Sequence, residues 1–108
     1  MVYLIKSASN NKNKVFYKIG FTYNLETRLK AYISDNPTIQ VVETINTHKK
    51  TKHQLEKQLH KELIKQGYKF HISLLNKQTE WFEVDIETSM SLKNFKCCKN
   101  RKVITDSL

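Results

Sequence analysis

The fold depends on one stretch of the chain, Val15-Phe-Tyr-Lys-Ile-Gly-Phe-Thr-Tyr-Asn-Leu-Glu-Thr-Arg-Leu-Lys-Ala-Tyr-Ile33. Residues 15–21 are rich in β-branched and aromatic side chains, which predicts a strand. Gly20 permits a bend or a close approach that a side chain would block. Asn24 is a good N-cap residue, and the apolar side chains after it recur at helical spacing, at Leu25, Leu29 and Ile33. The stretch therefore predicts a strand that leads directly into an amphipathic helix over about residues 24–35.

The segments on either side predict two more strands and a second helix. Short apolar or β-branched runs at residues 2–7 and 38–45 have the composition of strands. Thr51 opens a helical pattern, Gln54 completes a capping box, and Gly67 ends the helix. Its buried stripe is expected at four positions, Leu55, Leu59, Leu63 and Ile64. The order β-β-α-β-α predicts an α+β fold, a small antiparallel or mixed three-stranded sheet flanked by one layer of helices.

The last third of the chain has a weaker pattern. Residues 80–84 concentrate large apolar groups and predict a short strand or a core plug, with Trp81 and Phe82 in the core rather than stacked on nucleic-acid bases. Residues 85–94 are expected to form a last helix. We predict a single domain over residues 1–95 and a basic, mobile tail over residues 96–108.

The charge of the chain indicates what kind of partner it binds. There are 19 Lys and Arg against 10 Asp and Glu, a formal net charge of +9. That excess favours a polyanion, nucleic acid first and an acidic membrane surface second. No apolar run approaches the ~20 residues of a membrane span, and no signal peptide follows Met1. Because Cys97 and Cys98 are too few for a disulfide framework, we expect an intracellular protein, cytoplasmic or nuclear, without a membrane partner.

Several side chains of the kind that phosphodiester cleavage requires are expected near one another. That reaction needs a group that activates water, a fixed cation near the phosphoryl oxygens and a metal that assists the leaving oxygen. The first strand offers the phenol of Tyr3, and the second strand offers Lys18. Arg28 and Tyr32, four residues apart, form one stripe of the first helix. Glu56, on the second helix, is the candidate metal carboxylate.

The order and spacing of these residues resemble the GIY-YIG nuclease domain. Val2-Tyr3-Leu4 and Tyr17-Lys18-Ile19-Gly20 are similar to its paired motif, and Arg28 and Tyr32 follow at the family's helical spacing. Leu55-Glu56-Lys57-Gln58-Leu59 resembles the later helix that carries the family's metal-binding glutamate. Glu80-Trp81-Phe82 is similar to the closing signature of a phage- and large-virus-associated subgroup. The resemblance covers residues 2–84.

The resemblance implies a role for each matching residue. Tyr3 would act as the general base or position the attacking water, and Arg28 would bind the scissile phosphate. Tyr32 would orient the water or hydrogen-bond the phosphate. Glu56 would hold one Mg²⁺ or Mn²⁺ ion, which suits a lone carboxylate supplemented by phosphate and water.

The second motif departs from the family, because Lys18 stands where the family has tyrosine. Tyr17 lies one place earlier, which puts it on the opposite face of a strand, so we expect Lys18 on the active face and Tyr17 in the core. Lys18 would then either assist proton transfer, if its pKa is lowered, or clamp phosphate as a cation. The general base is therefore either Tyr3 or Lys18.

A further group of residues is expected to contact the nucleic-acid backbone: Lys49, Lys50, Lys52, His53 and His60. The two histidines flank Glu56 without the usual His-Glu-x-x-His register of a zinc site. We predict a metal-dependent endonuclease that hydrolyses DNA, or RNA, as a monomer or weak homodimer encoded by a virus, phage or mobile element. The alternatives are a non-catalytic nucleic-acid-binding module that retains the fold, and a basic structural or regulatory protein with a chance motif match.

Overall fold

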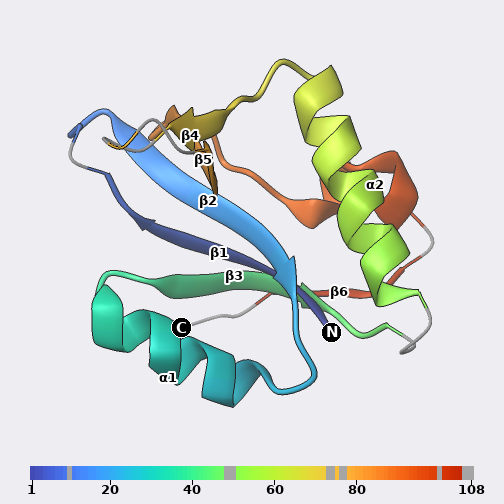
Figure 1. The fold of residues 1–108 in the computed structure, drawn as a ribbon. Helices are drawn as coiled ribbons and strands as arrows, with labels where there is room; N and C mark the ends of the chain where they lie inside the picture. Colours follow the sequence, from blue (N-terminus) through green and yellow to red (C-terminus); the bar gives the residue numbers. More distant parts are fainter. Residues whose placement is uncertain (10, 48–50, 73–74, 76–77, 100, 106–108) are drawn as a thin grey trace.

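The computed structural model describes residues 1–9, 11–47, 51–72, 75, 78–99 and 101–105. Among these residues, six strands form one antiparallel sheet in the order β4-β5-β2-β1-β3-β6 (Figure 1). The strands are β1 (Val2–Ala8), β2 (Lys14–Phe21), β3 (Gln40–Ile45), β4 (Phe70–Ile72), β5 (Gln78–Asp85) and β6 (Val103–Thr105). The helices are α1 (Leu25–Asp35) and α2 (Lys52–Lys65), with short 3₁₀ turns η1 (Leu92–Asn94) and η2 (Lys96–Cys98). None of the described helices is long and apolar enough to cross a membrane.

The α+β class is confirmed, but the predicted sheet is too small. The three predicted strands are β1, β2 and β3, and they lie together in the sheet. Three further strands flank them, with β5 on β2 and β6 on β3. Of these, β5 contains residues 80–84, where a short strand was one of the two structures predicted. Strands of three residues, such as β4 and β6, contain too few side chains to show an alternating pattern.

The two helices pack on opposite faces of the sheet, which corrects the prediction of one helical layer. Val2 and Leu4 share a buried cluster with the α2 side chains Leu55, Leu59 and Leu63. Tyr3 and Ile5 face the other way, into a second cluster that includes Leu25 and Leu29 of α1. All four β1 side chains are at most 2% exposed. An unbroken apolar run is expected of a strand that is covered on both faces.

The helix ends match the sequence predictions in part. The side chain of Asn24 accepts a hydrogen bond from the Thr27 amide at 3.1 Å, as an N-cap does. Thr51 occupies the N-cap position of α2 but its side chain makes no capping bond, so the predicted capping box is wrong. Gly67 has φ +96°, and the Gly67 and Tyr68 amides bond back to the helix in a Schellman ending.

The buried stripes also differ from the predicted ones at one position each. Ile33 is 43% exposed and Ile64 is 56% exposed, so neither belongs to the core. In α1 the inward stripe runs from Leu25 through Leu29 to Tyr32, which takes the place that was assigned to Ile33. In α2 the stripe stays narrow, with Leu55, Leu59 and Leu63 at most 1% exposed.

The C-terminal part of the described chain packs against the sheet instead of forming a last helix and a tail. Glu43, only 3% exposed, accepts hydrogen bonds from the Ser91 hydroxyl at 3.1 Å and the Leu92 amide at 2.7 Å. Turns and 3₁₀ segments replace the helix predicted over 85–94. Phe95 and Cys98 are buried, and β6 pairs with β3. The predicted boundary at residue 95 therefore falls within a packed segment, because a buried carboxylate and apolar anchors hold it.

Candidate active site

The site is built on a close approach between β1 and β2. Tyr3 and Gly20 are cross-strand partners, and the Tyr3 ring lies over the glycine. A Cβ atom at Gly20 would lie 2.6 Å from the Tyr3 hydroxyl and 2.7 Å from Cζ. No side chain fits in that space, so the predicted close approach at Gly20 is confirmed. Tyr3 itself is only 2% exposed.

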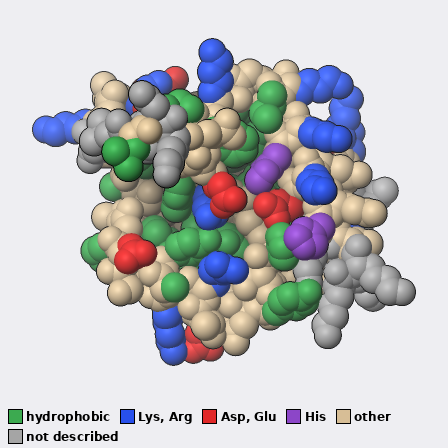
Figure 2. Space-filling model, in the orientation of Figure 1, with side chains coloured by type: hydrophobic (Ala, Val, Ile, Leu, Met, Phe, Trp, Pro, Cys, Tyr) green, Lys and Arg blue, Asp and Glu red, His purple; other side chains and the backbone are tan. Residues whose placement is uncertain are grey.

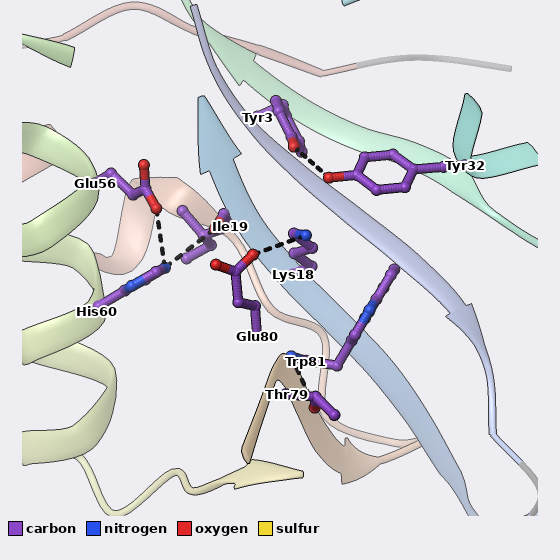
Figure 3. A network of polar contacts seen from close by, with 9 residues as sticks. All are labelled: Tyr3, Lys18, Ile19, Tyr32, Glu56, His60, Thr79, Glu80 and Trp81. Carbon is purple, nitrogen blue, oxygen red and sulfur yellow. Dashed lines mark hydrogen bonds and ion pairs between the residues drawn. The ribbon is translucent and has the colours of Figure 1, made fainter. Parts of the chain in front are cut away.

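Tyr32 of α1 meets Tyr3 on the α1 face of the sheet, and the two hydroxyls point toward one another (Figure 3). The two hydroxyl oxygens are 3.0 Å apart, and the rings meet edge to face with centroids 6.4 Å apart. The helix places Tyr32 here because its inward stripe passes through residues 25, 29 and 32. Two phenols from distant parts of the chain thus form one hydrogen-bonded pair.

Lys18 lies on the same face of β2 as this pair, and Tyr17 does not. Tyr17 is 6% exposed in the cluster under α2, which confirms the predicted placement of both residues. Lys18 Nζ is 2.9 Å from Glu80 Oε2 and 4.9 Å from the centre of the Tyr32 ring. It also lies 5.9 Å from the ring centre of Trp81. The ammonium is therefore held between a carboxylate and two aromatic rings.

These contacts separate the acidities of the two phenols. Burial and the hydrogen bond to Tyr32 raise the pKa of Tyr3 far above its usual value. Burial also acts to raise the pKa of Tyr32, but hydrogen bonds from Lys18 and Tyr3 and the nearby cations outweigh it and lower that pKa. Tyr32 is accordingly the phenol that ionises more readily, and once ionised it can only accept the hydrogen bond of the pair.

Lys18 remains a cation at neutral pH. Burial acts to lower its pKa, but its interactions with Tyr32 and Glu80 outweigh burial and raise the pKa above the usual lysine value. The bond to Lys18 in turn lowers the pKa of Glu80. A lysine that stays charged does not meet the condition set for proton transfer, a lowered pKa, so of its two predicted roles only the phosphate clamp is kept as a prediction.

The five predicted catalytic side chains line one pocket of about 230 Å³. Tyr3 and Lys18 form its floor, Arg28 and Tyr32 come from α1, and Glu56 comes from α2 on the opposite side of the sheet. Figure 2 shows acidic and histidine side chains close together on this face, with lysine and arginine side chains around them. One pocket thus brings together side chains of two strands and both helices.

Glu56 has the environment of a cation ligand. Burial raises the pKa of Glu56, and the carboxylate of Glu80 raises it further, while His60, His53 and Lys18 act in the opposite direction. Its Oε1 lies 4.0 Å from His60 Nε2. A partly desolvated carboxylate beside a second carboxylate is stabilised by a divalent cation, so these residues fit Mg²⁺ or Mn²⁺. Among the described residues there is no cluster of three or more His, Cys, Asp or Glu that could hold a metal alone.

The T5orf172 domain family model matches residues 1–100. The chain belongs to the T5orf172 domain family. This family is GIY-YIG-like and nuclease-associated. No curated protein and no solved structure matches the chain. The T5orf172 match spans every element that contributes to the pocket, from β1 to β5.

The residues of this T5orf172 domain that were expected to contact the nucleic-acid backbone do not share one environment. His60 Nε2 lies 3.0 Å from the Ile19 carbonyl oxygen, so it carries a proton and donates. The His60 ring also packs on the rings of Phe70 and Phe82. These contacts attach α2 to the sheet near the Tyr17–Phe82 pair, the last pair between β2 and β5. His60 therefore has a structural role that the sequence did not indicate.

The remaining predicted contacts lie toward the start of α2. His53 is exposed, and its ring centre is 4.1 Å from that of Phe21. Lys49 and Lys50 lie outside the described residues. Lys52 is the first residue of α2, and its side chain is also outside the described part. Of this group, only the two histidines can be placed beside the pocket.

Sequence reasoning missed Glu80 as a pocket residue, and its core placement of Trp81 holds in part, because Trp81 packs against the core cluster on the α1 face. Glu80 lines the pocket and pairs with Lys18, whereas Phe82 is fully buried as predicted. Trp81 is only half-buried and points to the α1 face of the T5orf172 domain. Trp81 and Phe82 face opposite sides of the sheet, as neighbours in a strand do, and this alternation could be predicted from the sequence. The contact of Glu80 with Lys18 could not be predicted, because it requires knowing that β5 pairs with β2.

Proposed function

We propose that this chain is a metal-dependent endonuclease of the GIY-YIG type that hydrolyses DNA phosphodiester bonds. The observation that carries this proposal is the convergence of two phenols, two cations and two carboxylates on one small pocket. Those groups come from β1, β2, α1, α2 and β5. Surface residues of a binding module need no such convergence. The Glu80-Trp81-Phe82 segment supports the phage- and large-virus-associated subgroup as the finer assignment.

The residues divide the reaction among them. Arg28 and Lys18 stabilise the negative charge that develops on the phosphoryl oxygens. Tyr32 accepts the proton of the attacking water, because its lowered pKa makes it the more readily ionised phenol. Tyr3 keeps its proton and holds the Tyr32 oxygen in place from 3.0 Å. This assignment moves the general base from Tyr3 or Lys18 to Tyr32.

Glu56 would hold the metal ion, with Glu80 next to it in the pocket. When bound, Mg²⁺ or Mn²⁺ supplies positive charge that stabilises the leaving oxygen. The protein contributes the position of the carboxylate, which α2 fixes through its buried leucines.

A supercoiled-plasmid nicking assay with Mg²⁺ or Mn²⁺ tests this function directly. The parent protein should convert supercoiled DNA into nicked circles, and EDTA should stop the reaction. Glu56→Ala should slow nicking by about 10²-fold or more, since it removes the metal carboxylate. Glu26→Ala is the matched control, because Glu26 is an exposed glutamate of α1 whose pair with Lys30 is weak. Cleavage at the parental rate in Glu56→Ala would place the activity elsewhere.

One observation favours a second candidate, a nucleic-acid-binding module without activity. Lys18 replaces the tyrosine of the second motif and is already engaged by Glu80 at 2.9 Å. In that case the cations would hold a phosphate that is never cleaved. A parent protein that binds DNA with strong salt dependence, yet cuts nothing with either metal, would support this candidate.

A further inference from the structure

A second and larger pocket, of about 630 Å³, lies beside the active site on the α1 face of the sheet. Its floor is one row of cross-strand neighbours, Ser7 on β1, Phe16 on β2 and Glu83 on β5. Tyr32 lines both this pocket and the catalytic one. The two spaces are therefore adjacent, and one strand of nucleic acid can occupy both.

Aromatic side chains form much of the wall. The Phe16 and Trp81 rings meet edge to face with centroids 6.4 Å apart, and Tyr32 lies across the pocket on α1. The Trp81 ring is also 5.9 Å from Lys18 Nζ, which links this wall to the catalytic cations. The volume falls in the range of small-molecule sites, and half-buried aromatic rings that line a pocket suit a planar base.

The charge of the pocket shows which part of a nucleotide belongs there. Asp35 and Glu83 line it, and Glu83 Oε2 accepts a hydrogen bond from the Ser9 hydroxyl at 2.8 Å. Carboxylates repel a phosphate, whereas they accept hydrogen bonds from the exocyclic amino groups of cytosine or adenine. The cations Arg28 and Lys18 lie in the neighbouring pocket instead. Phosphate and base thus have separate places.

We propose that this pocket binds one nucleobase that carries an exocyclic amino group, from the strand whose phosphate enters the active site. The proposal rests on the proposed function and names a substrate subsite for it. The base lies next to the scissile phosphate because Tyr32 borders both spaces. It reaches the pocket from single-stranded DNA or after leaving the duplex stack.

Trp81 makes the pocket directly observable, because it is the single tryptophan of the chain. Its fluorescence is titrated in EDTA, which prevents cleavage, with three five-nucleotide strands of equal phosphate number: oligo(dC), oligo(dT) and an abasic strand. Oligo(dC) should quench Trp81 and bind about tenfold or more tightly than the abasic strand, through stacking. Oligo(dT), which offers no amino group, should bind more weakly than oligo(dC).

Two variants test the wall and the carboxylate separately. Phe16→Leu keeps an apolar side chain but removes a ring, and should weaken oligo(dC) binding about tenfold. Glu83→Gln should remove the preference for oligo(dC) over oligo(dT). Glu87→Gln is the matched control, because Glu87 is exposed and lies two residues beyond the end of β5. It should bind as the parent does, and circular dichroism checks that all three variants fold.

The results that would overturn the pocket differ from those that would overturn the nuclease. An abasic strand that binds and quenches as well as oligo(dC), or a Phe16→Leu variant that binds like the parent, would overturn the base pocket even if plasmid is nicked. Base-dependent quenching by a parent that nicks nothing would support the base pocket and refute the endonuclease.

Discussion

The hydroxyls of Tyr3 and Tyr32 lie 3.0 Å apart but are chemically unequal. Tyr3 is buried at the contact of two strands, which strongly favours its neutral form. Burial acts against ionisation of Tyr32, but its hydrogen-bonded contacts with Lys18 and Tyr3 and the charge of Arg28 outweigh burial and favour the phenolate. Such divergence within a pair of titratable groups supports the roles proposed for them, with Tyr32 as the base and Tyr3 as the phenol that keeps its proton.

This inequality predicts the pH dependence of cleavage. The base must be ionised to act, so kcat/KM should rise with pH up to the lowered pKa of Tyr32, which lies below its usual 10.0. Lys18, with a pKa raised above 10.5, stays charged throughout this rise. Tyr32→Phe should remove the rising limb and most of the activity. Tyr3→Phe should keep the limb but move it to higher pH, because Tyr32 loses a donor; a profile unchanged in Tyr32→Phe would refute the assignment.

For single residues, the sequence predicted which side chains lie at the candidate site better than it predicted which of them is the general base. Strand alternation correctly put Lys18 on the active face and Tyr17 in the core. The sequence left the general base open between Tyr3 and Lys18, and the raised pKa of each disfavours both of them as the base. Acidity depends on distances between residues that are far apart in sequence, such as Lys18 and Tyr32, and no local pattern contains them.

Among the elements, β1 and β2 carry the most demanding constraint. The Tyr3 ring occupies the space over Gly20 that any Cβ would fill, and that contact fixes where the phenol pair stands. Gly67 is required for a different reason, because its φ of +96° ends α2 and the space around it is open. One glycine therefore serves the site, and the other serves only the helix.

Substituting each glycine by alanine should separate these two roles. Gly20→Ala must displace the Tyr3 ring, and we expect cleavage to fall by about 10²-fold, as a misplacement of about 1 Å can cause. Gly67→Ala should lower the free energy of unfolding by about 1 kcal/mol, because alanine is strained at positive φ. It should leave the cleavage rate unchanged well below Tm. Activity equal to the parent's in Gly20→Ala would show that the Tyr3 position is not critical.

The elements that the sequence predicted correctly are those with long, regular patterns. The apolar run of β1 and the strand-to-helix stretch of β2 and α1 were both found. The predicted helix over 85–94 was wrong, because the Glu43 carboxylate and buried Leu92 hold that segment in turns. Ile33 was misassigned because, at 3.6 residues per turn, the position eight residues after Leu25 has rotated away from the inward face, whereas Tyr32, seven residues after Leu25, lies on that face.

The whole molecule carries a formal net charge of +9, yet carboxylates lie within the candidate site. Lysine and arginine side chains surround the acidic ones on this face (Figure 2), and in the proposed function they attract the DNA. DNA affinity should therefore depend steeply on salt. With about four phosphates contacted, Kd should rise about 10²-fold between 50 and 200 mM salt.

This salt dependence is measured with Glu56→Ala, so that no DNA is cleaved during the titration. Fluorescence anisotropy of a labelled duplex gives Kd at each salt concentration. An affinity that is indifferent to salt would show that the positive surface does not contact the phosphates.

The most direct test of the single composite site is the single-turnover cleavage rate of supercoiled plasmid by Arg28→Ala, Glu56→Ala and the double variant, with Lys30→Ala as an exposed control on α1. We predict that the cleavage rate of each single variant falls about 10²- to 10³-fold, whereas Lys30→Ala cuts at the parental rate. The rate of the double variant should be little lower than that of the slower single variant, because the two residues act as a unit. Parental rates in both single variants would contradict the account.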